Sequence, residues 1–561
     1  MKSPAGLASG VAEMQQQSLM SSSFLALLVV ALFALIHRLA WHAPMRAVRF
    51  LCQQGVPVLP YRVPFIGNIL EIVRLLRSTD SICLAPHNHS YLHRILPFYA
   101  KYSSSYGKSF VFWLGRSPTL YVANADYLKD IMSTHHKHYP KASIAPVLVE
   151  RLFGQGISSV EGEEWENQRR ILNPAFFLDK IKGMVGAMRI SALEMATNWN
   201  SMLEKASKSG IDSPTVEVEV AAAFKTLTAD ILAHTCFGTS YKQGKTAFED
   251  QCSILNLTWK DNMWHFLLPI YRYFPTPTNI QSWKLQRSMT KSLKEVVDSR
   301  IRLARKGWSS SYGEDLLGLI LAANDSDAAD FSQAEDKRAY SRRLSISQIV
   351  DECKTFFFAG HETTATLLTW TMMLLAQHQD WQREARSEVL NICGDKSQTI
   401  TAEDLGKLRV VSMILNETLR LYPPVPQLIT RMQSMQHGKG MYKMGQLLLP
   451  GMSLRVAALP VVLHRDPLLW GEDAELFNPQ RFAEGTSKAC NHPNGFIPFG
   501  LGPHICIGQN FALIEAKVIL AIILQHFEFS LSPRYQHAPQ MKITLSPQFG
   551  VPIILKKIVV S

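Results

Sequence analysis

The chain has 561 residues, 47% of them hydrophobic, so it can bury a large core and is not disordered as a whole. Its net charge of +12 is not gathered into a basic arm with interleaved aromatic residues, which argues against nucleic-acid binding and favours a membrane surface or an acidic protein partner. The eight cysteines are scattered without a CxxC pair, so they suggest neither a disulfide framework nor a zinc ribbon and fit a reducing, cytosol-facing location.

An uncharged segment near the N-terminus, residues 18–36, is continuously apolar from residue 24 onward and approaches the ~20 residues that cross a bilayer. Basic residues follow at once, including Arg38, Arg46 and Arg49, and predict that the rest of the chain lies on the cytoplasmic side. A cleaved signal peptide is the alternative. The features of a signal peptide are missing. The polar segment before the apolar run is long, Lys2 is the only basic residue in that segment, and no small-x-small cleavage site follows the run.

Prolines and glycines interrupt residues 53–68 so densely that the sequence predicts neither a helix nor a central strand there. From about residue 70 the pattern becomes mainly helical, with short β runs at 109–115 and 119–124.

Trp165 and Arg169 stand four residues apart, and therefore on one face of a predicted helix. A guanidinium suits a carboxylate because its fork donates two hydrogen bonds at once. By itself such a pair is more often a cation–π contact at the surface.

The segment 351–370 has the length and hydrophobicity of a buried helix. Residues that weaken or bend a helix stand in its middle: Gly360, Glu362, Thr363 and Thr364. A glycine there costs ~1 kcal/mol relative to alanine, and a threonine can bond back to a carbonyl one turn earlier. A helix weakened in its centre usually has a functional reason. The zinc-protease motif HExxH begins at His361 but fails, because Ala365 stands where the second histidine is needed.

Glu417 and Arg420 place an acid and a base three residues apart on one helix face, and two prolines shortly after them end that helix. An ordinary surface ion pair is the alternative, because such pairs are plentiful. The segment FNPQRF at 477–482 follows about sixty residues later and contains Arg481.

A single cysteine, Cys506, ends a loop with glycines at 500, 502 and 508, and a predicted helix begins directly behind it. A cysteine at a helix N-terminus faces free backbone N–H groups and the positive end of the helix dipole, which favour a thiolate that can ligate a metal. The glycines let the backbone turn tightly and let a flat group approach it. An inert buried thiol is the alternative for any lone cysteine.

The sequence has no dinucleotide-binding GxGxxG fingerprint, no P-loop and no GxSxG nucleophile motif. It therefore predicts no nicotinamide or flavin site in this chain, and electrons for any redox reaction must come from a partner.

In chain order, the anchor, the proline-rich segment, the Trp165 helix, the AGHETT stretch at 359–364, ExxR, FxPxRF and the cysteine loop resemble the cytochromes P450. The resemblance implies a mainly α fold with a small β-rich lobe and an N-terminal transmembrane helix. The implied domains are an anchor at 1–45, a hinge at 46–70 and a catalytic domain at 71–561. It also implies haem b with the Cys506 thiolate as axial ligand. The cofactor-binding residues carried over from the family are Phe499, Trp165, Arg169, Arg431 and His504.

The resemblance further implies a monooxygenase that uses dioxygen and electrons from NADPH-cytochrome P450 reductase, at the endoplasmic reticulum membrane. Glu362 and Thr363 correspond to the acid–alcohol pair that relays protons. Glu417, Arg420 and Arg481 correspond to an ionic cluster that supports the core behind the haem. The residues expected in a mostly apolar pocket for a lipophilic substrate are Phe358, Val425, Pro426, Gln427 and Phe549.

Several segments resemble the plant P450s that hydroxylate terpenoids, gibberellins, brassinosteroids and cytokinins, and QQGV, RILPFY and DECKTFFFAGHETT resemble the cytokinin hydroxylases most. Gibberellin or diterpenoid, brassinosteroid and fatty-acid hydroxylases are the alternatives. A haem-thiolate isomerase or a haem sensor is a further alternative, which the retained Glu362 and Thr363 argue against.

The cysteine loop departs from the family at one position. His504 stands where the family usually has an arginine that grips a haem propionate. Histidine is shorter and cannot make the bidentate contact, so the sequence predicts weaker haem binding that is more sensitive to alkaline pH.

Overall fold

A computed structural model of the full chain gives the fold. It describes residues 23–24, 27–31, 34, 43–61, 63, 66–141, 146–208, 214–238, 247, 249–258, 264–265, 269–305, 312–331, 343–395, 398–427, 431–432, 442–444, 447–449 and 454–558. The predicted anchor at 18–36 lies largely outside these residues. Among the residues that are described, no helix is both long and apolar enough to cross a membrane.

Helices are the main secondary structure among the described residues. They are α2 (Ala43–Gln53), α3 (Ile69–Thr79), α4 (Leu92–Ile95), α5 (Pro97–Tyr106), α6 (Ala125–Lys129), α7 (Pro146–Phe153), α8 (Gly162–Leu172), α9 (Leu178–Ser207), α10 (Val220–Phe237), α12 (Pro277–Arg305), α13 (Leu316–Phe331), α14 (Ile346–Gln377), α15 (Gln379–Cys393), α16 (Ala402–Lys407), α17 (Arg409–Leu421), α18 (Pro460–Leu463), α19 (Pro467–Trp470) and α20 (Gln509–His526).

The strands are short and form small sheets. They are β1 (Val111–Leu114), β2 (Ser117–Val122), β3 (Thr215–Glu219), β4 (Arg431–Met432), β5 (Tyr442–Met444), β6 (Leu447–Leu449), β7 (Arg455–Ala458), β8 (Phe527–Leu531), β9 (Pro539–Met541), β10 (Leu545–Pro547) and β11 (Pro552–Lys557). The β runs predicted at 109–115 and 119–124 are confirmed as β1 and β2. The predicted fold class, mainly α with a small β-rich part, is also confirmed.

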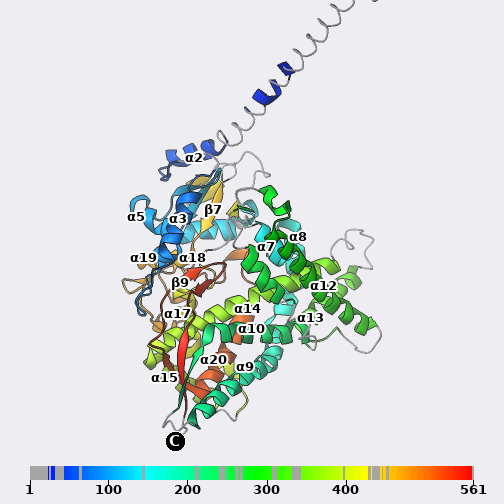
Figure 1. Cartoon of the computed structure of the whole chain (residues 1–561), viewed down its shortest axis with the longest axis vertical. Coiled ribbons are helices and arrows are strands. Elements are labelled where there is room, and N and C mark those ends of the chain that lie inside the picture. Colours follow the sequence, from blue (N-terminus) through cyan, green and yellow to red (C-terminus); the bar gives the residue numbers. More distant parts are fainter. Residues whose placement is uncertain are drawn as a thin grey trace, which may run out of the picture.

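The largest sheet has the strand order β1-β2-β7-β4. β1 and β2 form an antiparallel hairpin, β2 pairs with β7 in parallel, and β4 pairs with β7 antiparallel. A second sheet has the order β3-β11-β8 and joins the middle of the chain to its end. β7 lies with α3 and α5 toward one end of the molecule, and α9, α15 and α20 lie toward the other end (Figure 1).

Helix α14 crosses the centre of the helical part and contacts α10, α12, α17 and α20 (Figure 1). It begins at a capping box, in which the Ser345 side chain accepts from the Gln348 backbone and the Gln348 side chain accepts from the Ser345 backbone. Most of its residues from Ile349 to Ala376 are buried, as predicted for a helix that is hydrophobic all round. The core therefore gathers around α14.

The proline-rich segment after α2 is attached to the sheet. Leu59 N donates to Val111 O at 2.8 Å, Val111 N donates to Pro57 O at 2.9 Å, and the Trp113 indole donates to Leu59 O at 3.1 Å. Helix α2 occupies the first residues of the predicted hinge at 46–70. The division of the chain into anchor, hinge and catalytic domain stays a prediction.

One buried carboxyl lies where α20 meets α14. Glu515 is 1% exposed. Burial raises the pKa of its carboxyl to about 8, although the nearby Thr364 hydroxyl acts in the opposite direction. Because a free glutamate titrates near pH 4.3, the folded chain holds a proton here that the unfolded chain has lost between about pH 4.3 and pH 8. Stability contributed by this group is therefore present at acidic pH and is lost as the pH rises toward 8.

We expect Glu515→Gln, which imitates the protonated acid, to raise the unfolding free energy at about pH 8 and to have little effect near pH 5. Urea unfolding at both values measures the difference, with Glu484→Gln on the exposed surface as the control. An equal effect of Glu515→Gln at both pH values would contradict the assignment.

Candidate active site

The Cys506 loop depends on glycines with left-handed backbone angles. Gly500 has φ +81° and Gly502 has φ +73°. A Cβ atom on Gly502 would lie 2.2 Å from Met132 O, so no other residue fits at this point. The turn closes through a hydrogen bond from Cys506 N to Phe499 O at 2.9 Å, and α20 begins three residues later. The loop therefore holds Cys506 at a fixed place in front of a helix.

Three influences act on the pKa of the Cys506 thiol. Desolvation raises it, whereas the Gly508 backbone N–H and the Arg169 charge lower it. Gly508 is the N-cap of α20, so this end of the helix favours the charged sulfur. A coordinated metal ion removes the thiol proton outright. The site is thus suited to a metal-bound thiolate.

Helix α8 brings Trp165 and Arg169 to this loop. The Arg169 guanidinium donates to Ile505 O at 2.9 Å, directly beside Cys506. The Trp165 ring lies against the His504 ring with centroids 3.9 Å apart, and His504 Nε2 is 3.8 Å from Glu161 Oε2. Four of the predicted cofactor residues therefore meet at one place, and Phe499 joins them through the loop.

Arg431 is the remaining predicted cofactor residue. Its backbone pairs with Val456 between β4 and β7, and its side chain lies outside the described part of the structure. Its predicted contact with a propionate stays a prediction.

The middle of α14 has an accessible stripe. Within the buried run of this helix Ala359 is exposed, and Gly360 and Thr363 are partly accessible. The Thr363 hydroxyl donates to Ala359 O at 2.6 Å, the back-bond expected for threonine in a helix. The opposite side of Gly360 is closed, because an added Cβ would lie 3.0 Å from Leu232. Ala359, Gly360 and Thr363 are thus the accessible positions in the middle of an otherwise buried helix.

Glu362 faces another direction from this stripe. Its carboxylate Oε1 accepts from Lys225 Nζ of α10 and from Thr544 Oγ1, both at 3.0 Å. The Glu362 side chain is 10% exposed, whereas that of Lys225 is 44% exposed and reaches solvent. The described contacts of Glu362 and Thr363 thus go to different partners. Lys225 and Thr544 were not predicted, because they lie 137 and 182 residues from Glu362.

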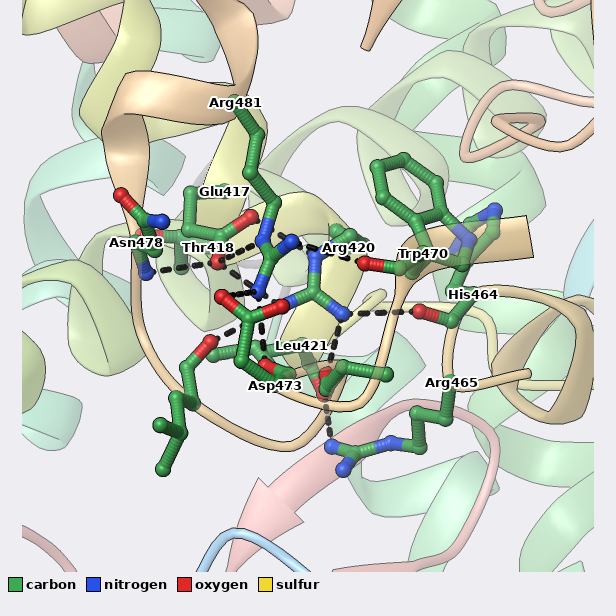
Figure 2. A network of polar contacts seen from close by, with 12 residues as sticks. Glu417, Thr418, Arg420, Leu421, His464, Arg465, Trp470, Asp473, Asn478 and Arg481 are labelled. Carbon is green, nitrogen blue, oxygen red and sulfur yellow. Dashed lines mark hydrogen bonds and ion pairs between the residues drawn. The ribbon is translucent and has the colours of Figure 1, made fainter. Parts of the chain in front are cut away.

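The Glu417 carboxylate and the Arg420 guanidinium form a two-pronged ion pair, with both contacts at 2.7 Å and both side chains fully buried (Figure 2). Arg481 Nε lies 3.6 Å from Glu417 Oε1, so the three residues of the predicted cluster meet. Asn478 N also donates to Glu417 Oε1 at 2.8 Å. Asp473, which was not predicted, pairs with Arg481 at 2.5 Å.

Arg420 connects this cluster to the segments that lead to the cysteine loop. It donates to the backbone oxygens of His464, Ala474 and Leu476 at 2.9, 2.6 and 3.0 Å (Figure 2). The His464 ring accepts a hydrogen bond from Ile497 N at 3.0 Å, two residues before the loop begins. Burial lowers the pKa of His464 to about 3, so the ring stays neutral and able to accept.

The residues predicted for the substrate pocket differ in accessibility. Phe549 is 50% exposed, and Val425 and Gln427 are partly accessible. Phe358 is 3% exposed and packs against Phe153 with ring centroids 5.3 Å apart, whereas Pro426 is buried and accepts from Val461 N. The accessible members are therefore the better candidates for contact with a substrate.

The residues around Cys506 fit a haem on the chemistry of their side chains. The Cys506 thiol is held in front of a helix. Beside it, the half-buried Arg169 and the Trp165 indole can donate hydrogen bonds to carboxylates. Accessible residues also interrupt the buried helix α14. This donor set matches an iron ligand, propionate partners and a place for a small ligand.

We expect Glu417→Gln to lower the unfolding free energy by about 3–5 kcal/mol, because it leaves the buried Arg420 without its counter-charge. Thermal or urea unfolding measures the change. The exposed Glu384→Gln serves as the control. An unfolding free energy equal to that of the parent would show that the pair does not hold the core.

The comparisons with known proteins agree with this geometry. The family model of cytochrome P450 matches residues 57–556. Cytochrome P450 709B1 of Arabidopsis thaliana is 38% identical, with 95% of this chain and 98% of the relative covered. Cytochrome P450 734A1 of the same plant is 37% identical, with 96% of each covered. The structure of retinoic acid bound cyanobacterial CYP120A1 matches with a TM-score of 0.68 at 21% identity, over 90% of this chain and all of the other. The chain therefore belongs to the cytochrome P450 family and is a haem-thiolate monooxygenase.

Proposed function

We propose that this P450 hydroxylates a lipophilic plant hormone or terpenoid, with the isoprenoid side chain of a cytokinin as the specific candidate. The similarity to plant P450s over nearly the whole chain carries the proposal. The accessible apolar residues Ala359, Val425 and Phe549 support a lipophilic substrate. Gibberellin precursors, brassinosteroids and fatty acids are the alternative substrates.

The roles proposed for the side chains near Cys506 follow from their chemistry. When bound, the haem supplies the cleavage of dioxygen and the insertion of an oxygen atom into a C–H bond. Cys506 would provide its axial ligand. Arg169, the Trp165 indole N–H and His504 would hold its propionates, since each can donate a hydrogen bond to a carboxylate.

Glu362 and Thr363 would deliver protons. The carboxylate of Glu362 is held by Lys225, whose side chain reaches solvent, so this pair would take up protons at the surface side of α14. The Thr363 hydroxyl lies on the accessible stripe and would present a proton to a ligand there. The retention of both residues favours a monooxygenase over an isomerase.

Electrons would come from NADPH-cytochrome P450 reductase. An anchor at residues 1–45 would hold the protein in the endoplasmic reticulum membrane, with the catalytic domain on the cytoplasmic side. The basic charge of the chain would help it meet an acidic partner.

The test of the substrate is co-expression with a plant P450 reductase and parallel feeding of isopentenyladenine nucleotides, gibberellin precursors, brassinosteroids and fatty acids. We expect a hydroxylated product from the isopentenyladenine nucleotides, detected by mass spectrometry. The Cys506→Ala variant controls for background oxidation by the host. A product from another class alone would replace the cytokinin assignment and leave the monooxygenase class intact.

His504 offers a test of haem binding. We expect His504→Arg to retain haem better than the parent, with a gap that widens from about pH 6 to about pH 8.5, because arginine can make the bidentate contact with a propionate and keeps its charge throughout this range. Haem release to apomyoglobin measures retention, and His492→Arg, which pairs with Asp126 elsewhere on the surface, is the control. Equal release at both pH values would contradict the role of His504.

A further inference from the structure

A cavity of about 510 Å³ lies among four helices, α9, α16, α17 and α20. Its volume falls within the ~300–1,000 Å³ that is usual for small-molecule sites. None of the residues predicted for haem or substrate contributes to its lining. The cavity is therefore distinct from the site formed by those residues.

One face of α20 forms a wall of this cavity. Asn510, Leu513, Ile514 and Lys517 all line it, and their spacing of three and four residues places them on one side of the helix. Leu405 of α16 and Leu415 of α17 add apolar surface from the other helices. Leu178 at the start of α9 is 45% exposed and extends the apolar surface toward the opening.

A cation and two amides supply polar groups against this apolar wall. Lys517 is partly buried and donates to Leu405 O at 2.9 Å, which leaves two of its three N–H donors for another acceptor. The side-chain amides of Asn416 and Asn510 make no hydrogen bond within the part of the chain that the structure describes. Lys517 and the two amides therefore offer donors along the cavity, with Asn510 at its exposed side and the Glu388 carboxylate near Lys517 but outside the lining.

The other charged residues of the lining stand in exposed positions. Lys182 has an exposed side chain that lies 3.9 Å from Asp179. Glu403 is exposed at the rim, where water and salt screen its charge. The charge that a bound ligand meets inside is thus that of Lys517. Burial lowers the pKa of Lys517, opposed by the nearby Glu388, as expected for an ammonium that is short of solvent.

We propose that this cavity binds an amphipathic carboxylate, with its hydrocarbon part against Leu405, Leu415 and Leu513 and its carboxylate at Lys517 and the two asparagine amides. One cation with neutral amide donors matches a singly charged head group. The apolar residues match a hydrocarbon chain or ring system, because burying apolar surface away from water favours binding. Since α20 begins three residues after Cys506, the ligand would rest on the helix behind the cysteine loop.

The test uses the haem-loaded protein with its iron saturated by imidazole, as checked by the absorption spectrum. Calorimetry then measures the binding of dodecanoate, with dodecanol and acetate as probes that keep only the apolar chain or only the charge. We expect saturable binding of one dodecanoate and affinities for both control probes that are weaker by about tenfold or more.

Two pairs of variants locate the bound dodecanoate. Lys517→Met should weaken it by about tenfold, whereas Lys407→Met, a neighbouring lysine that pairs with Asp404, should not. Gly406→Trp should abolish binding, because its side chain would enter open space at the cavity. Gly183→Trp, also in open space but outside the lining, is its control.

The results decide the proposal in either direction. Absence of saturable dodecanoate binding, or binding that Gly406→Trp leaves unchanged, would overturn it. If Lys517→Met fails to fold, Gly406→Trp decides alone, because that change removes no contact of the protein. Binding that both Trp variants weaken equally would place the ligand elsewhere and would also overturn it.

Discussion

The buried ion pair between Glu417 and Arg420 is the contact on which the active site depends. Burying two full charges away from solvent costs free energy. The fold tolerates this pair because almost every donor of Arg420 and acceptor of Glu417 makes a hydrogen bond. Arg420 donates to three backbone oxygens in the segment after β7, and Glu417 accepts from the backbone of Asn478. The pair thereby fixes the irregular chain that leads to Cys506, which has few strands or helices of its own.

Desolvation extends the effect of the ion pair toward the cysteine loop. It keeps the His464 ring neutral, so that the ring can accept from Ile497 and connect the ion pair with the loop. The fold therefore supplies the position of Cys506, and a bound metal ion would remove the proton of its thiol.

Local spacing explains what could be predicted from the sequence. Glu417 with Arg420, and Trp165 with Arg169, are separated by one helical turn, so their shared faces follow from helix geometry alone. The central position of α14 follows from its continuous hydrophobicity. The haem ligand Cys506 was recognisable because only glycine can adopt the turn at Gly502, which leaves a signature in the sequence.

Contacts between distant segments could not be predicted in the same way. Lys225 belongs to α10 and Thr544 to the C-terminal region, and both reach Glu362 only because these segments pack on α14. No periodicity in the sequence distinguishes Lys225 from the many other lysines. The same reasoning applies to the cavity beside α20, whose lining comes from four helices. Each of these helices contributes only one face to the cavity, and in the sequence such a face looks like an ordinary amphipathic pattern. The cavity therefore results from the packing of the helices and cannot be read from any single motif.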